Sequence, residues 1–386
     1  MSVRIEQIAQ CIEQFAPKTW AEEWDNVGLL VGGGANTVDK VLMALDGTMP
    51  VVEEAKRLGA QLIIAHHPII FRPLKNLRTD NKNAVVPIEL LQSGIGYYAA
   101  HTNLDQSVFS SAMMLAKALE LKNVDYMTAS AESLVKLAVF VPPDYVEELR
   151  TALAKVGVGA GITDGDKSES YSDCFFQTAG EGMFRALEGA NPAVGRVGAL
   201  NRVEEVKLES IVPEALAERA VRALRRAHPY EEPAFDLIPL QNRGKRRGYG
   251  AIGYVDKPMS LKEFDSFFKA TLSNDGAALY PRSDYRLSGI RIAGEEDMKV
   301  RKIGIANGSG NSFVGKALAL GVDLLITGEL DYHSLLDGLA GGMAVCEMGH
   351  FLSEVPMLGG LQNYLSSDST LQEVDFIISS VEQAPW

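Results

Sequence analysis

The chain has 386 residues, 46% of them hydrophobic, and a net charge of −13. Because domains usually contain about 100–150 residues, this length predicts two or three domains, and the hydrophobic content is sufficient for their cores. The acidic charge argues against a nucleic-acid surface, since duplex binding depends on Lys and Arg contacts to phosphates. The one dense basic run, residues 243–247, is expected to be a solvated linker.

Cysteine usage and the N-terminal sequence bear on the cellular compartment. Cys11, Cys174 and Cys346 are far apart and form no Cys-x-x-Cys pair, so we expect neither a disulfide framework nor a thiolate zinc site. Glu6 and Glu13 stand where a signal peptide would be basic or apolar, and no stretch approaches about 18 consecutive apolar residues. We therefore expect a reduced, cytoplasmic protein with no membrane span.

Strand and helix patterns alternate in the first and last thirds of the chain. In the first third we predict helices at 5–15, 50–58, 84–92 and 110–121 and strands at 40–45, 62–65 and 96–100. In the last third we predict strands at 302–306, 323–327 and 343–346 and helices at 312–320 and 334–339. Such alternation predicts βαβ units around a mostly parallel sheet.

The two thirds also resemble each other. Residues 55–65, AKRLGAQLIIA, are similar to residues 317–327, ALALGVDLLIT, and each segment runs into a histidine-bearing loop. Two interpretations remain open, an internal duplication or the ordinary likeness of any two βα units. In both cases the polar residues follow the carboxyl ends of strands, where open α/β sheets bind ligands.

The middle of the chain follows a different pattern. Strands are predicted at 136–141, 171–178, 207–212 and 234–238 and helices at 143–156 and 213–227, with glycine-rich or charged stretches at 157–170 and 243–248. Strand, helix, two strands, helix and strand is the ferredoxin-like order. We therefore predict an α/β protein whose outer domain, 1–130 and 243–386, consists of two similar βα halves around a mostly parallel sheet. An inserted ferredoxin-like α+β domain, 131–242, interrupts it.

Three histidines and two carboxylates follow predicted strands of the outer domain. His66 and His67 end one strand, Asp105 follows the next, and His350 and Glu354 follow the last, one helical turn apart. Adjacent strand residues point to opposite faces, so His66 and His67 share a site only if the chain turns there or if they bind different metals. Without thiolates, this set is typical of zinc, manganese, cobalt or ferrous iron. We predict two divalent metals per chain, zinc first among the candidates, with Glu354 as the bridge; an exposed polar helix start is the alternative for 350–354.

Other polar residues near strand ends suggest supporting roles. His101 is predicted to hydrogen-bond to the metal ligands, and Glu329 and His333, four residues apart, to transfer protons during catalysis. Ordinary loop and cap hydrogen bonds are the alternative for each.

A glycine-rich loop leads from a predicted strand into a helix. Gly308, Ser309 and Gly310 are predicted to bind an anion through backbone N–H groups. A P-loop is rejected because Ala317 replaces the required Ser or Thr.

Six segments, taken in order, resemble the motif series of the NIF-three-like dinuclear metal-centre family, whose members are often named GTP cyclohydrolase I type 2. They are 24–29 (WDNVGL), 65–68 (AHHP), 101–105 (HTNLD), 308–310 (GSG), 327–329 (TGE) with His333, and 349–350 (GH) with Glu354. The likeness covers 1–128 and 248–386, and residues 228–233 (HPYEEP) resemble the PII-like or CutA-like insertion of longer bacterial members.

The resemblance implies a function and an assembly. His66, His67, Asp105, His350 and Glu354 would coordinate two metals, and the chain would form a ring-shaped homohexamer whose sites face an internal cavity. Two departures concern the substrate side: residues 106–111 lack the family's glycine pair, and Glu329 stands where Asp is common.

The leading functional hypothesis is a metal-dependent hydrolase with a small-molecule substrate, by resemblance GTP, in which water attacks the purine ring and formate is released. A phosphoesterase that releases phosphate is one alternative. Another is a non-enzymatic metal-binding regulator whose insert contacts a partner.

Overall fold

The computed structural model describes residues 3–161, 171–273 and 289–384. The chain divides into an outer unit, Met1–Ala129 with Gly248–Trp386, and an inserted unit, Ser130–Arg247. Of the glycine-rich stretch predicted at 157–170, residues 162–170 lie outside the described residues. No helix in the described ranges is long and apolar enough to cross a membrane.

The first half of the outer unit is built on a five-stranded sheet with the order β15-β4-β5-β6-β2. Its strands are β2 (Gly28–Val31), β4 (Lys40–Ala44), β5 (Leu62–Ala65), β6 (Gly96–Ala99) and β15 (Asp375–Ile378); β2 is antiparallel to β6 and the other pairs are parallel. Successive residues of β5 enter different cores, Leu62 and Ile64 one, Ile63 and Ala65 the other. Both faces of the sheet are therefore covered, which explains why its strands are apolar without alternation.

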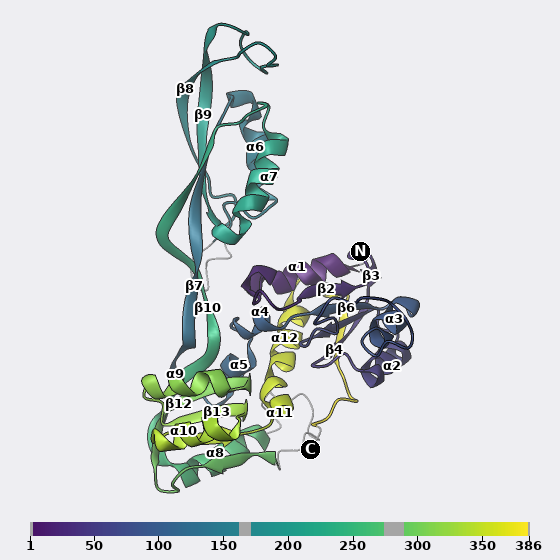
Figure 1. The fold of residues 1–386 in the computed structure, drawn as a ribbon, viewed down its shortest axis with the longest axis vertical. Helices are drawn as coiled ribbons and strands as arrows, with labels where there is room; N and C mark the ends of the chain where they lie inside the picture. The colour runs from purple at the N-terminus through teal and green to yellow at the C-terminus, as the bar shows by residue number, and fades with distance from the viewer. Residues whose placement is uncertain (1–2, 162–170, 274–288, 385–386) are drawn as a thin grey trace. The chain divides into compact units, whose positions relative to one another are not determined.

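Helices on the two faces of this sheet supply the cores. Helices α1 (Ile5–Phe15) and α12 (Pro356–Ser367) contribute to one core, and α2 (Met49–Leu58) and α3 (Val85–Gln92) to the other. A short antiparallel pair, β1 (Val3–Arg4) with β3 (Thr37–Val38), lies beside α1. Helix α12 comes from the far end of the chain, so the first half is completed only when the C-terminal segment has been added (Figure 1).

The second half repeats the first. Strands β12 (Lys299–Ser309), β13 (Leu324–Glu329) and β14 (Ala344–Glu347) are parallel neighbours, and β11 (Arg291–Ala293) is antiparallel to β14. Its helices are α8 (Leu261–Ser273), α9 (Val314–Ala319) and α10 (Tyr332–Ala340). In both halves three parallel strands in chain order are followed by an antiparallel strand that precedes them in the sequence. This shared topology supports the duplication interpretation.

Three short helices follow strands or precede α12: α4 (Thr102–Asp105), α5 (Ser111–Ala118) and α11 (His350–Glu354). Helix α5 contacts α11, α12 and β12, so it packs against elements of both halves.

The inserted unit has the chain order β7 (Lys122–Val141), α6 (Val146–Ala154), β8 (Phe176–Arg185), β9 (Leu200–Pro213), α7 (Ala217–Ala227) and β10 (Phe235–Ser260). Its strands are arranged β10-β7-β9-β8, and α6 and α7 lie side by side on one face (Figure 1). Leu149 and Leu224 from the helices share a core with Val139 and Leu208 from the strands. The predicted order of strands and helices is therefore observed, although the strand predicted at 171–178 is displaced to β8.

Strands β7 and β10 are much longer than predicted and continue into the outer unit. The basic run 243–247, which we interpreted as a solvated linker, is part of β10, and this prediction is wrong. The strand is held by pairing with β7, and backbone pairing leaves no signature in charged side chains. Next to the unit boundary Tyr249 N donates to Thr128 Oγ1 at 3.1 Å. The segments where the chain leaves and re-enters the outer unit are therefore in direct contact.

Candidate metal centre

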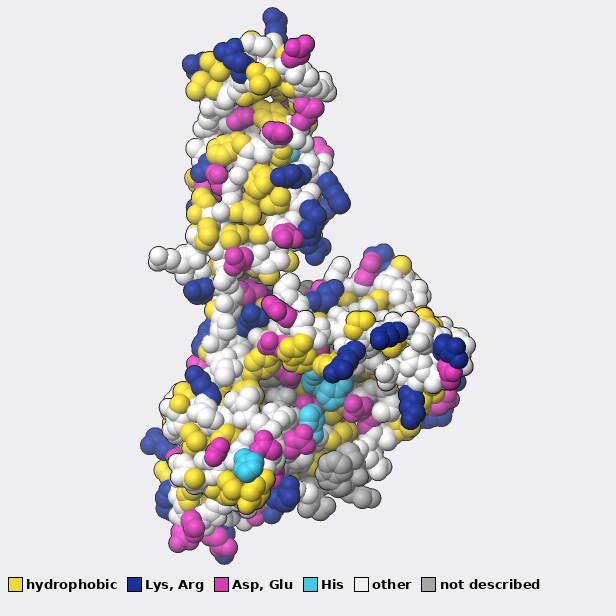
Figure 2. All heavy atoms as spheres, in the orientation of Figure 1, with side chains coloured by type: hydrophobic (Ala, Val, Ile, Leu, Met, Phe, Trp, Pro, Cys, Tyr) yellow, Lys and Arg dark blue, Asp and Glu magenta, His cyan; other side chains and the backbone are white. Residues whose placement is uncertain are grey.

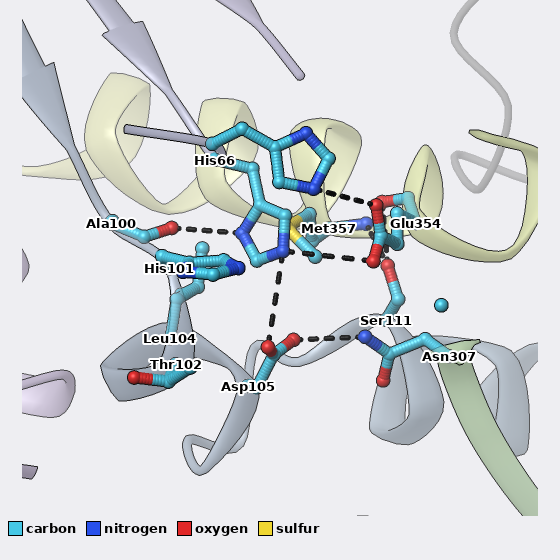
Figure 3. Close-up of polar contacts among 12 residues, drawn as sticks. His66, Ala100, His101, Thr102, Leu104, Asp105, Ser111, Asn307, Glu354 and Met357 are labelled. Atoms are coloured by element: carbon cyan, nitrogen blue, oxygen red, sulfur yellow. Dashed lines mark hydrogen bonds and ion pairs between the residues drawn. The ribbon is translucent and has the colours of Figure 1, made fainter. Parts of the chain in front are cut away.

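Residues that follow three parallel strands of the outer unit meet in one cluster. His66 and His67 follow β5, His101 and Asp105 follow β6, and His350 and Glu354 belong to α11 after β14. His66 Nε2 lies 3.8 Å from both Asp105 Oδ2 and Glu354 Oε1 (Figure 3). The cluster thus combines the strand ends of both halves.

His66 presents a lone pair to two carboxylates. Its Nδ1 is 2.9 Å from Ala100 O and donates to this carbonyl, which fixes the tautomer and leaves Nε2 as an acceptor. The residue is 2% exposed, and burial lowers its pKa to about 3, so Nε2 carries no proton at neutral pH. Nε2 is buried without a hydrogen-bond partner. A buried acceptor that faces two carboxylates requires a partner that these side chains do not supply when ionised, and a metal cation is such a partner.

Glu354 is the centre of the cluster. Its Oε1 lies 3.2 Å from His350 Nε2 and its Oε2 3.3 Å from His67 Nε2, and the residue is 4% exposed. Burial by itself would raise the pKa of Glu354, but the imidazoles of His350 and His67 outweigh it and hold the pKa well below its usual range. Glu354 is therefore an ionised carboxylate whose two oxygens face different imidazoles.

A second layer of carboxylates orients two of these imidazoles. Asp46 Oδ1 is 2.9 Å from His67 Nδ1, and Glu329 Oε1 is 3.1 Å from His350 Nδ1. Burial alone would lower the pKa of His67, but Asp46 and Glu354 raise it to about 10. Contact with Glu354, helped by Glu329 and opposed by burial, raises the pKa of His350 to about 9. Carboxylates on Nδ1 turn Nε2 toward the cluster and increase its basicity, as second-layer partners of metal-bound histidines do.

Asp105 occupies the opposite side of the cluster. Burial, together with the charge of Glu354, raises its pKa to about 7. Asn307 Nδ2 donates to Asp105 Oδ1 at 2.9 Å and leaves Oδ2 directed at His66 (Figure 3). The roles of Asn307 and Asp46 as partners of the candidate ligands were not predicted from the sequence. Asp46 carried a signal, because it comes two residues after β4 at the same edge of the sheet as His66.

His101 has a more direct place than the supporting role we predicted. Its Nδ1 is 2.9 Å from Asp25 Oδ1, so the supporting hydrogen bond comes from Asp25. The ligand atoms of His66, His67 and His101 lie within 4.8 Å of one another, and so do those of His67, His350 and Glu354. The structure thus contains two overlapping ligand groups that share His67. Figure 2 shows histidine side chains gathered beside acidic ones on this face of the outer unit.

Asp25 belongs to the WDNVGL segment and ties it to the cluster. It accepts from Thr102 N at 3.1 Å as well as from His101. Burial would raise its pKa, but the hydrogen bonds from His101 and Thr102 lower it to about 2. Asn26 Nδ2, in turn, donates to Ile70 O at 2.5 Å in the loop that follows His67.

The predicted anion site and catalytic pair are arranged as follows. Gly308 N donates to Ser353 Oγ at 2.8 Å and Gly310 N to Glu329 O at 3.0 Å, so both N–H groups have partners within the protein. Gly308 has φ +61°, and a Cβ there would stand 2.6 Å from Glu354 Oε1, so its role is close approach of the backbone. Glu329 holds His350, whereas His333 packs beside Tyr332 in α10 and belongs to neither ligand group.

The residues present fit a pair of divalent cations. The set offers imidazole nitrogens and carboxylate oxygens without thiolate, two of its buried atoms, His66 Nε2 and Glu354 Oε2, have no hydrogen-bond partner, and its central carboxylate is ionised. A cavity of about 500 Å³ opens beside it, with Asp46, His67, Glu329, His350 and Glu354 in its lining. A small molecule could reach the cluster from this side.

Comparison with known proteins shows the family of the chain. Residues 3–385 match the model of the family described as Duf34/NIF3 (NGG1p interacting factor 3). The chain belongs to the Duf34/NIF3 family. Among its relatives, a protein of Halalkalibacterium halodurans named "GTP cyclohydrolase 1 type 2 homolog" is 37% identical over 382 residues, which is 98% of this chain and 97% of the relative. A Bacillus subtilis protein of the same name is 36% identical and covers 100% of this chain and 98% of its own length.

A solved Duf34/NIF3 structure also matches the whole chain. The Bacillus cereus protein related to NIF3 aligns with a TM-score of 0.74 and 36% identity, covering 100% of this chain and 99% of its own. The family resemblance inferred from the six sequence segments is therefore confirmed.

Proposed function

We propose that this Duf34/NIF3 protein is a hydrolase that depends on two divalent metals, with zinc the first candidate and manganese, iron or cobalt as alternatives. The observation that carries the proposal is the buried Nε2 of His66, which has no hydrogen-bond partner and faces the carboxylates of Asp105 and Glu354. His66, His67, Asp105, His350 and Glu354 would hold the two metals, and the ring nitrogen of His101 lies within 4.8 Å of those of His66 and His67.

The protein's own groups would determine how such a site works. Bound metals would supply a nucleophilic water near neutral pH and stabilise negative charge on the attacked group. Asp46 and Glu329 hold His67 and His350 by their Nδ1 atoms, and Asn307 holds Asp105, so the ligand atoms are oriented before any substrate arrives. Glu329 lines the cavity, which supports it as the proposed proton-transfer residue.

GTP is the proposed substrate, with attack of water on the purine ring and release of formate. The names of the relatives support this choice. The family description also mentions an interaction with a protein partner, which supports the regulator as the second candidate.

The test combines metal analysis with product detection. Purified protein is analysed for metal by mass spectrometry and assayed with GTP for formate and for phosphate, with and without chelator. About two metals per chain and chelator-sensitive formate are expected. Chelator-sensitive phosphate would transfer the assignment to a phosphoesterase, metal without either product would favour the regulator, and no metal after reloading would contradict the site itself.

We also propose a homohexamer and a PII-like or CutA-like character for the inserted unit. The strand order β10-β7-β9-β8 with two helices on one face supports the second proposal. Strand β8 is an edge strand with exposed Phe176 and Met183, and an apolar edge of this kind is a template for pairing with another chain, which supports an oligomer. Sedimentation equilibrium measures the number of chains directly.

A further inference from the structure

Two large aromatic side chains stand exposed beside the metal centre. Trp24 is 56% and Phe71 47% exposed, and their ring centroids are 5.7 Å apart with planes tilted by 53°. The Trp24 ring is also 6.1 Å from the ring of His101, which it meets edge to face. Single exposed hydrophobic residues are ordinary, but a contacting aromatic pair next to a polar cluster is the composition of a ligand site.

The backbone that carries these rings is fixed to the cluster. Next to Trp24, Asp25 accepts hydrogen bonds from His101 and Thr102, and Asn26 donates to Ile70 O, next to Phe71. The two aromatic loops are therefore tied to each other and to the histidines. The loops that carry the rings are thus held in place before a ligand binds, which lowers the entropic cost of binding.

The distance from the aromatic pair to the histidines indicates which kind of ligand would fit there. His101, the nearest ring to Trp24, lies 5.0 Å from His66 and 5.5 Å from His67, so a ligand on the aromatic pair is one imidazole ring away from the proposed metals. Such a ligand needs an apolar face for the aromatic rings and polar atoms for the metals. A planar heteroaromatic ring has both, because its faces are π surfaces and its nitrogen and oxygen atoms lie in the ring plane.

We propose that Trp24 and Phe71 form a stacking platform that binds the planar heteroaromatic ring of the substrate next to the metal centre. This inference rests on the proposed function for the role of the ring, and it assigns substrate recognition to two residues outside the ligand set. Neither side chain supplies a metal ligand, so their replacement leaves the cluster complete.

The experiment measures binding to the full-length, metal-containing protein by calorimetry, with GTP as the ring-bearing probe and inorganic triphosphate as the ringless probe. Stacking of one base contributes about 1–3 kcal/mol by alanine substitution, so Trp24→Ala and Phe71→Ala should each weaken GTP binding by about 5- to 150-fold. Triphosphate binding and metal content should not change. Trp24→Phe should retain most of the affinity, and Tyr171→Ala, which removes a ring that is 67% exposed in the inserted unit, should have no effect.

Three results would overturn the platform. GTP could bind no more tightly than triphosphate, Trp24→Ala could weaken both probes equally, or Trp24→Ala could dissociate the oligomer in sedimentation, which would show that a second copy covers the rings. Failure of the hydrolase proposal is a separate observation. If GTP binds more tightly than triphosphate but neither formate nor phosphate is released, only the hydrolase proposal is contradicted. If Trp24→Ala turns over GTP with an unchanged KM, only the platform is contradicted.

Discussion

Asp46 Oδ1 lies 2.9 Å from Nδ1 of His67, although Asp46 belongs to neither ligand group. It comes after β4 and His67 comes after β5, two parallel neighbours whose carboxyl ends lie at one edge of the sheet. The contact gives His67 a defined tautomer and directs Nε2 at Glu354. Asp46, which is not itself a candidate ligand, thus sets the orientation in which His67 would bind a metal.

Replacement of Asp46 should therefore weaken metal binding while leaving every ligand in place. We expect Asp46→Asn to lower metal affinity by about 10–100-fold, because the amide is a weaker acceptor for the Nδ1 proton. Competition with a chromogenic chelator measures the affinity. Asp39→Asn, an exposed aspartate before the same strand, is the matched control. Equal affinities for wild type and Asp46→Asn would contradict the orienting role.

Glu354 should be the most sensitive position in the cluster. Glu354→Gln keeps the size of the side chain but removes the charge that faces His67 and His350, so we expect neither metal to be retained through purification. Glu329→Gln changes a half-exposed side chain whose carboxylate lies 3.1 Å from the outer nitrogen of His350, Nδ1, so the loss of metal should be partial. Mass spectrometry counts the metals that each variant retains. A greater loss in Glu329→Gln than in Glu354→Gln would disprove Glu354 as the shared carboxylate.

Gly308 offers a steric test of the same centre. Gly308→Ala places a Cβ 2.6 Å from Glu354 Oε1 on a backbone with φ +61°, so it should both destabilise the fold and reduce metal binding. Gly59→Ala, with φ +70° and no atom within 4 Å of its Cβ, has the backbone penalty alone, about 1–2 kcal/mol of unfolding free energy. Urea unfolding and metal analysis of both variants separate the two effects. Intact metal binding in Gly308→Ala would mean that the backbone does not approach the centre as described.

His228 should make the inserted unit less stable in acid. Its Nε2 donates to Phe140 O at 2.9 Å and its Nδ1 accepts from Tyr230 N at 3.1 Å, so the folded state holds the neutral form. Burial lowers the pKa of His228 below its ordinary 6.5. Below pH 6.5 the unfolded chain takes up a proton that the folded chain does not, and stability falls as the pH decreases, by at most about 1.4 kcal/mol per pH unit for one proton.

The measurement is thermal unfolding of wild type and His228→Gln between pH 5 and 8. Glutamine can replace the neutral donor and acceptor but cannot be protonated, so the difference between the two proteins should shrink on acidification. A constant difference across this range would rule out His228 as the titrating group.

The candidate metal ligands could be predicted from the sequence, but the residues that hydrogen-bond to them could not. His66, His67, Asp105, His350 and Glu354 follow apolar strands, and parallel strands bring their ends together, so the cluster could be anticipated from local patterns. Asp25 and Asn307 could not, because they reach their partners His101 and Asp105 across 76 and 202 residues, and no spacing records such a contact.

The fold shows a similar limit. The buried strands β4, β5 and β13 were predicted, since a short apolar run bounded by turns is a strong signal. The length of β10 was missed because its residues alternate weakly and include a basic run, while its conformation is imposed by pairing with β7. Helix α12 was missed as well, although Pro356, Met357, Leu358 and Leu361 are buried, because Gly359 and Gly360 interrupt its pattern.

The contact between Thr128 and Tyr249 has an evolutionary consequence. The chain leaves and re-enters the outer unit at neighbouring points on two paired strands, so the 118 residues from Ser130 to Arg247 can be exchanged for a tight turn without moving either flank. We infer that an outer unit needs only one hairpin in order to acquire or lose this module, so shorter chains with the same outer fold are expected.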